Sequence, residues 1–106
     1  MRRGEVYWVR FPSGVGGMIR KARPAVVVTS DAAIPHLNRV QVVPLTSHTH
    51  RRYRGEALVT VGTRASKALA TQVTTVDKSL IDDHYAALST ADLAEVDRAL
   101  RQQLGL

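Results

Sequence analysis

Short apolar runs alternate with polar or glycine-containing breaks along most of the chain, a pattern typical of small β-rich proteins. The runs are rich in β-branched and aromatic residues, and turn-forming residues bound them, so they predict strands. The predicted strands cover residues 5–11, 24–30, 38–45, 57–61, 67–74 and 85–88. Within the 67–74 run, the two-residue period of a strand places Gln72 and Thr74 on one face.

The last part of the chain predicts the one clear helix. Ser89 is a good N-cap residue, and Asp92 stands three residues later in a box-like position. Apolar residues recur at steps of three and four along one face, namely Leu93, Val96, Leu100 and Leu104, and Gly105 ends the pattern. Five or six short strands followed by one helix predict a mainly β fold, a small and strongly curved barrel with the helix packed on it.

The run Ala25–Val28 is short, uncharged and mostly β-branched, as expected of a strand buried on both faces. Pro24 lacks an N–H group, which suits the first position of a strand, and Pro44 near the end of the following run predicts an edge or a terminus. Proline also disfavours helical backbone for the residue before it, so Arg23 is predicted in an extended conformation at the mouth of the strand. On these residues alone, an arginine that merely flanks a strand is the competing interpretation.

The chain of 106 residues predicts one domain, residues 1–106, with enough length to bury a core. Its formal net charge of +6 is unevenly distributed, because residues 1–67 hold twelve Lys or Arg residues against three Asp or Glu residues, whereas residues 68–106 hold three against six. Twelve of the fifteen cations are arginines, which favour bidentate contacts with phosphate. The basic part predicts a polyanionic partner, with a generic arginine-rich composition as the alternative.

Several classes of protein do not fit the composition. The chain has no cysteine, so disulfides and thiolate metal sites are excluded. No apolar run approaches the length of a membrane span, and the charged N-terminus lacks the apolar stretch of a signal peptide. We therefore expect a soluble protein of the cytoplasm.

Two polar segments are candidates for contacts with nucleic acid. Residues 12–17 contain three glycines in four positions and predict a flexible loop that leads to Arg20 and Lys21. This loop lacks the Walker pattern and precedes a strand, so nucleoside triphosphate binding is rejected. Residues 51–55 form a basic turn around Tyr53, suited to phosphate and base-stacking contacts. A solvated hairpin tip is the alternative interpretation of that turn.

Three short motifs, in this order and spacing, resemble the MazF/PemK family of toxins. They are Arg2–Tyr7 at the start, the glycine loop followed by Arg20–Val28, and Val42–Ser47. The terminal helix, with its serine start and its leucine and valine face, is similar as well, so the resemblance covers nearly the whole chain. It implies a toxin of a type II toxin–antitoxin pair, with an SH3-like barrel fold and a homodimeric assembly.

The resemblance also implies an activity. Members of this family cut single-stranded RNA, chiefly mRNA, at short sequences without a metal or other cofactor, and they leave a 2′,3′-cyclic phosphate and a 5′-hydroxyl. The family's catalytic arginine and threonine correspond here to Arg23 and Thr46. The implied partner is a cognate acidic antitoxin of the MazE type, whose partly disordered tail folds on binding. The residues expected to bind RNA are Arg20, Lys21, Ser47, His48, Arg51, Arg52, Gln72 and Thr74.

The side chains of the catalytic pair suit this chemistry. Attack by the ribose 2′-hydroxyl on the adjacent phosphate builds negative charge, which the guanidinium of Arg23 and the hydroxyl of Thr46 can stabilise by donating hydrogen bonds. Arginine stays protonated and is a poor general base, so the base is left open. His48 is the local candidate, because histidine is the side chain that ordinarily titrates near neutral pH. It lies outside the family motif, and an ordinary surface histidine is the alternative.

The chain departs from the family pattern within residues 67–74. Many relatives carry an acidic residue before the glutamine and an arginine two residues after it, where this chain has Thr71 and Thr74. PemK-like relatives use an arginine and an aspartate as acid and base at positions matched here by Leu69 and Thr71, so that mechanism is not carried over. Because Arg23 and Thr46 are present, a changed cleavage sequence is expected instead of lost activity.

Two other functions stay open as alternatives. A CcdB-like gyrase poison shares the fold, but that group ends in an exposed tryptophan, whereas this chain ends in Gln103–Leu106 and its one tryptophan is Trp8. A non-catalytic RNA-binding barrel keeps the basic surface and lacks the reaction.

Overall fold

The computed structural model describes residues 1–12 and 22–106. The predicted glycine loop beyond Pro12, and with it Arg20 and Lys21, lies outside the described residues. The strands are β1 (Glu5–Arg10), β2 (Ala22–Val27), β3 (Arg39–Thr46), β4 (Glu56–Val61), β5 (Arg64–Leu69), β6 (Thr74–Asp77) and β7 (Ile81–Ala87), and the helix is α1 (Thr90–Leu104). Short 3₁₀ turns cover Ile34–His36, Ala70–Gln72 and Lys78–Leu80.

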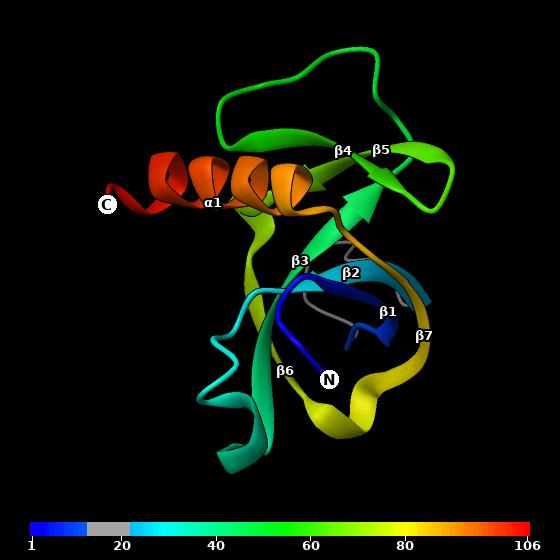
Figure 1. The fold of residues 1–106 in the computed structure, drawn as a ribbon, viewed down its shortest axis with the longest axis vertical. Coiled ribbons are helices and arrows are strands. Elements are labelled where there is room, and N and C mark those ends of the chain that lie inside the picture. The colour runs from blue at the N-terminus through cyan, green and yellow to red at the C-terminus, as the bar shows by residue number, and fades with distance from the viewer. Residues whose placement is uncertain (13–21) are drawn as a thin grey trace.

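The strands form one antiparallel, strongly curved sheet in the order β4-β5-β3-β2-β1-β7 (Figure 1). Strand β3 lies at its centre, because it pairs with β2 along one side and with both β6 and β5 along the other. Helix α1 packs against β4 at one end of the molecule (Figure 1). The expected mainly β fold with a packed C-terminal helix is confirmed, as an antiparallel half-barrel. No helix within the described ranges is long and apolar enough to cross a membrane.

Two hydrophobic clusters lie on opposite faces of the central strands. Strand β2 contributes Val26 to the cluster under α1, whereas its neighbours Ala25 and Val27 belong to the other cluster. Strand β3 divides in the same way, with Val43 in the first cluster and Val42 in the second. Because successive side chains of a strand point to opposite faces, both strands are buried on both sides. The prediction that the valine run forms a doubly buried strand is therefore confirmed.

The helix begins and ends where the sequence predicts. The Ser89 side chain accepts a hydrogen bond from the Asp92 N–H at 3.1 Å, and Gly105 ends the helix in a left-handed conformation. The carboxylate of Asp92 accepts from the Thr60 N–H at 2.8 Å, so it also ties α1 to strand β4. Val96 is fully buried, but Leu104, the last position of the predicted apolar face, is exposed.

The predicted strand over residues 67–74 is wrong, because the chain there forms two strands separated by the 3₁₀ turn Ala70–Gln72. The reason lies in β3, which pairs with β5 only at Leu45 and Thr46 and with β6 from Arg39 to Val42. The chain has to move along β3 between the two ladders, and the turn makes this shift. The two-residue period therefore does not relate Gln72 to Thr74. The described residues form seven strands, whereas the sequence predicts five or six.

Pro24 and Pro44 lie inside strands, where the sequence predicts strand ends or edges. Pro24 is the third residue of β2, but β2 pairs with β3 only from Ala25 onward, so Pro24 has a neighbour on the β1 side alone. Pro44 pairs with Ala25 of β2. On the other side of β3, it lies between Val42, which pairs with β6, and Leu45, which pairs with β5. Each missing N–H thus falls where one ladder is interrupted. The last strand also differs from the prediction, since it begins at Ile81.

Gly4 makes the junction between the sheet and the helix. Its N–H donates to the Val27 carbonyl at 2.8 Å, and its carbonyl accepts from the Leu88 N–H at 2.9 Å. Its φ is +92°, and a Cβ added there would stand 3.0 Å from Cδ2 of Leu93 on α1. Both the conformation and the closeness of the helix therefore favour glycine at this position.

The substitution Gly4→Ala is expected to lower the free energy of unfolding by about 2–3 kcal/mol, from backbone strain and displacement of Leu93. Gly62→Ala is the matched control, because Gly62 also has a positive φ but no atom of the described residues lies within 4 Å of an added Cβ. It should cost about 1 kcal/mol, from strain alone. Urea denaturation of both variants measures the difference, and equal losses would contradict a packing role for Gly4.

Candidate functional site

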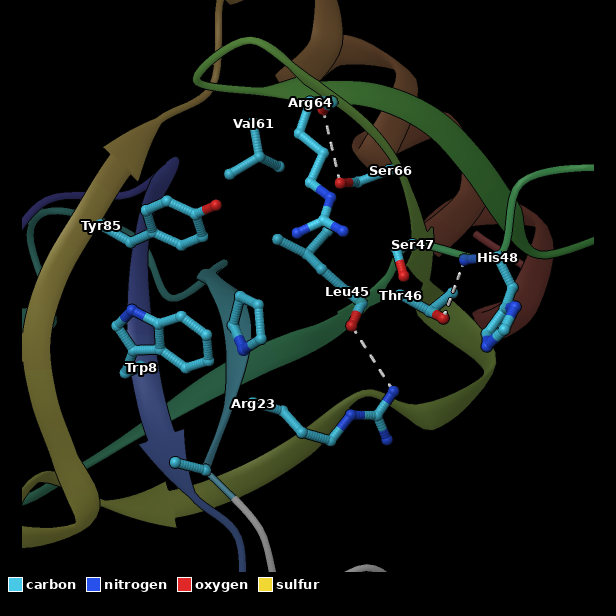
Figure 2. A pocket seen from close by; sticks show the side chains of 12 residues that line it. Trp8, Arg23, Leu45, Thr46, Ser47, His48, Val61, Arg64, Ser66 and Tyr85 are labelled. Atoms are coloured by element: carbon cyan, nitrogen blue, oxygen red, sulfur yellow. Dashed lines mark hydrogen bonds between the residues drawn. The ribbon is translucent and has the colours of Figure 1, made fainter.

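A pocket of about 400 Å³ lies where the ends of β2 and β3 meet strands β1, β5 and β7 (Figure 2). Its volume lies in the lower part of the range of small-ligand sites. The chain brings its lining residues together from positions up to 77 apart. They are Trp8, Ala22, Arg23, Pro24, Leu45, Thr46, Ser47, His48, Val61, Arg64, Ser66 and Tyr85.

Arg23 is held at the rim of this pocket by the backbone. It is the second residue of β2, and its Nη2 donates to the carbonyl of Leu45 on β3 across 3.5 Å, a long and weak hydrogen bond (Figure 2). A guanidinium has five N–H donors, so at most one is engaged in this contact. The side chain is only partly buried and keeps donors for an anion in the pocket.

Thr46, the last residue of β3, presents its hydroxyl in the same pocket. Its Oγ1 accepts a hydrogen bond from the backbone N–H of His48 at 3.3 Å (Figure 2). Because a hydroxyl carries one donor as well as its acceptor sites, this contact leaves the Thr46 O–H proton available. The turn at Ser47 thus fixes the orientation of the threonine and places the exposed His48 side chain on the wall of the pocket.

A buried ion pair anchors the segment that follows His48. Lys67, directly opposite Thr46 in the β3–β5 ladder, contacts Glu56 at 3.1 Å, and the two side chains are only 10 % and 12 % exposed. Its Nζ also donates to the carbonyl of Arg51 at 2.9 Å. Burial by itself raises the pKa of Glu56, but hydrogen bonds from the Tyr53 N–H and from Lys67, together with the charge of Lys67, lower it overall.

The structure brings together only part of the predicted RNA-binding set. Of its described members, Ser47 and His48 line the pocket together with the predicted catalytic pair Arg23 and Thr46, whereas Arg51, Arg52, Gln72 and Thr74 are exposed and do not line it. In the predicted basic turn, the Arg51 guanidinium and the Lys67 ammonium each lie 5.8 Å from the centre of the Tyr53 ring. Two cations of the protein therefore already contact this ring.

The sequence analysis did not identify four polar or aromatic side chains of the pocket as site residues, namely Trp8, Arg64, Ser66 and Tyr85. Arg64 and Ser66 come from β5, on one wall, and Trp8 and Tyr85 come from β1 and β7, on another (Figure 2). The only signal in the sequence for these residues was their polar or aromatic type. Within the described part of the chain, no three His, Asp or Glu side chains gather as a metal site requires.

Comparison with protein families shows which family the chain belongs to. Residues 2–104 match the model of the PemK-like, MazF-like toxins of type II toxin–antitoxin systems. The chain belongs to this family. It is also a homologue of endoribonuclease MazF9 from Mycobacterium tuberculosis, with 32% identity over 115 residues that span 100% of this chain and 98% of the relative. The resemblance found in the sequence is thereby confirmed.

Solved structures agree with this family assignment. MazF from Deinococcus radiodurans superposes with a TM-score of 0.83 at 26% identity, over 100% of this chain and 97% of that chain. An endoribonuclease from a mycobacterial species, solved in complex with its cognate antitoxin, gives a TM-score of 0.82 at 25% identity, over 100% of this chain and 96% of that chain. The half-barrel with its C-terminal helix is therefore a MazF-like fold.

Proposed function

We propose that this toxin is an endoribonuclease that cuts single-stranded RNA, mRNA in particular, by internal attack without a metal or other cofactor. The proposal rests on one observation above all. Arg23 and Thr46, which lie on different strands, line one open pocket, and both keep hydrogen-bond donors that no described residue engages and that a phosphate can take. Full-length homology to an endoribonuclease supports the choice of substrate.

In the proposed reaction, the ribose 2′-oxygen attacks the adjacent phosphorus. The 2′-O–P bond forms as the bond from phosphorus to the 5′-oxygen breaks, which leaves a 2′,3′-cyclic phosphate and a 5′-hydroxyl. Arg23 donates hydrogen bonds to the non-bridging oxygens as their negative charge grows, and Thr46 adds one more. Holding the attacking and leaving oxygens in line supplies further acceleration.

The reaction also needs a base for the 2′-hydroxyl proton and an acid for the leaving 5′-oxygen. His48 is the candidate base, because its imidazole stands on the pocket wall two residues from Thr46. Ser47, from the same turn, and the exposed cations Arg51 and Arg52 contribute to RNA binding, as do Arg20 and Lys21. Gln72 and Thr74 lie outside the pocket, so in this proposal they contact RNA beyond the reacting nucleotides.

The experiment that tests this function is cleavage of a long single-stranded RNA by the purified protein in excess EDTA. We expect fragments whose 5′ ends are phosphorylated by a kinase without prior dephosphorylation, and whose 3′ ends resist ligation until the cyclic phosphate is opened and the remaining phosphate is removed. Sequencing the 5′-hydroxyl ends gives the recognition sequence. If the protein binds the RNA but leaves it intact, the proposal is wrong and the protein is a non-catalytic RNA-binding barrel.

The partner in this proposal is a cognate acidic antitoxin of the MazE type. The excess of cations in residues 1–67 attracts an acidic tail in the same way as it attracts RNA. Relatives solved in complex with their antitoxins support the assignment. The toxin itself is taken as a homodimer in the cytoplasm, where its RNA substrates are. Light scattering of the purified protein tests the dimer, and a mass of one chain would contradict it.

A further inference from the structure

Two aromatic side chains of the pocket are stacked on each other and left open to solvent. The rings of Trp8 and Tyr85 lie 5.4 Å apart between centroids at an interplanar angle of 12°, the geometry of an offset stack. Each of the two residues is 38 % exposed, although both rings are large and apolar. An exposed aromatic pair on the wall of a pocket indicates a surface that binds something planar or apolar.

The register of the sheet places this pair beside the proposed reaction centre. Trp8 on β1 stands directly opposite Pro24, the residue after Arg23, in the β1–β2 ladder. Tyr85 comes from β7, which pairs with the other edge of β1. Figure 2 shows both rings on one wall of the pocket, with Arg23 and Thr46 across from them. A nucleotide whose phosphate meets Arg23 therefore has these rings within reach of its base.

The charges of the pocket distinguish among occupants. None of the described lining residues is acidic, while Arg23 and Arg64 are both cationic. The Arg64 side chain extends into the pocket (Figure 2), and its guanidinium has no hydrogen-bond or ion-pair partner among the described residues. An apolar protein segment would cover these guanidinium groups without pairing them, which is unfavourable. RNA offers phosphates and acceptor-bearing bases to the arginines and flat bases to the aromatic rings.

We propose that Trp8 and Tyr85 form a stacking wall that binds a nucleobase of the RNA next to the phosphate that is cut. The inference rests on the proposed function and deepens it, because it assigns a base-binding subsite to two residues outside the proposed catalytic pair of Arg23 and Thr46. Stacking accepts any base, since every base has a π-face, so this wall supplies affinity and position. Hydrogen bonds from Arg64 to the edge of the same base add preference among bases.

Trp8 is the only tryptophan of the chain, so the intrinsic fluorescence of the wild-type protein reports on this wall directly. The probes are four 2′-O-methyl homo-oligonucleotides, one for each base, which cannot be cut because the attacking oxygen is blocked. Linear polyphosphate of similar charge is the base-free control. We expect at least one oligonucleotide to quench Trp8 emission with saturation and polyphosphate to leave it unchanged. Equal quenching by polyphosphate, or no quenching by any of the four, would overturn the proposal.

Variants separate base stacking from folding and from the reaction. Tyr85→Leu and Trp8→Leu are expected to weaken binding of a labelled oligonucleotide by about tenfold to a hundredfold, and Trp8→Phe should restore most of the loss. The control Leu37→Ser removes an exposed apolar side chain outside the pocket and should bind like the wild type. Circular dichroism confirms that each variant is folded.

Three further results are decisive. Unchanged binding by folded Trp8→Leu and Tyr85→Leu, in a protein that still cuts RNA, would overturn the stacking wall alone. A wild-type protein that quenches with oligonucleotides but cuts no RNA would overturn the reaction and leave the wall in place. A lower mass of Trp8→Leu by light scattering, without a change in its affinity for RNA per chain, would show that the pair covers a second copy of the protein and would overturn the proposal.

Discussion

Replacing Arg23 with alanine is expected to lower the rate of RNA cleavage at saturating substrate by about a hundredfold to a thousandfold. The loss follows from the role of its guanidinium as the main donor to the phosphate oxygens, which carry most charge in the transition state. The variant should stay folded, because Arg23 is only partly buried and, among the described residues, its side chain makes only the long hydrogen bond to Leu45. Single-turnover cleavage of a labelled RNA under excess enzyme measures this rate without product release.

Two more substitutions sharpen this test. Arg23→Lys keeps the charge but loses the planar set of donors, so its rate should lie between those of the wild type and the alanine variant. Arg39→Ala is the matched control, because it removes an exposed arginine at the opposite end of β3, outside the pocket. A general effect of positive charge on RNA binding would lower the activity of both alanine variants alike, and that result would contradict a specific role for Arg23.

The largest expected effect on stability comes from Lys67→Met, which should lower the free energy of unfolding by about 3 kcal/mol. The substitution leaves the Glu56 carboxylate buried without its cation and frees the carbonyl of Arg51. The double variant Glu56→Leu/Lys67→Met should regain most of this loss, because a buried ion pair is often replaced by apolar side chains at little cost. Urea denaturation of both variants and of Glu56→Leu gives the coupling energy. Additive losses would show that the pair does not act as a unit.

The same ion pair makes stability depend on pH. Because the folded protein lowers the pKa of Glu56, its contribution is fully present above the ordinary pKa of glutamate, about 4.3, and is lost as the pH falls through the lower folded value. We expect the wild type to lose stability below about pH 4 more steeply than the Glu56→Leu/Lys67→Met variant. Parallel curves for the two proteins would contradict this assignment.

Local features could be predicted from the sequence because they depend on neighbouring residues. The valine run after Pro24 predicted a doubly buried strand, and Ser89 and Gly105 predicted the ends of the helix, since capping and strand burial are decided within a few positions. The motifs around Arg23 and Thr46 predicted the family correctly. The order of these elements in the chain also predicted a mainly β fold with a packed terminal helix.

Only the tertiary structure decided which side chains meet. The 67–74 run is divided because β3 exchanges one partner strand for another, which no local pattern reports. Pairing of β1 with both β2 and β7 brings Trp8 and Tyr85 to the pocket of Arg23, and pairing of β3 with β5 sets Lys67 opposite Thr46. The two-residue period tells which residues share a face of one strand, but the register between strands distant in sequence decides what stands opposite them. The sequence by itself thus determined the candidate catalytic pair, and the register of the sheet decided the aromatic wall and the ion pair that surround it.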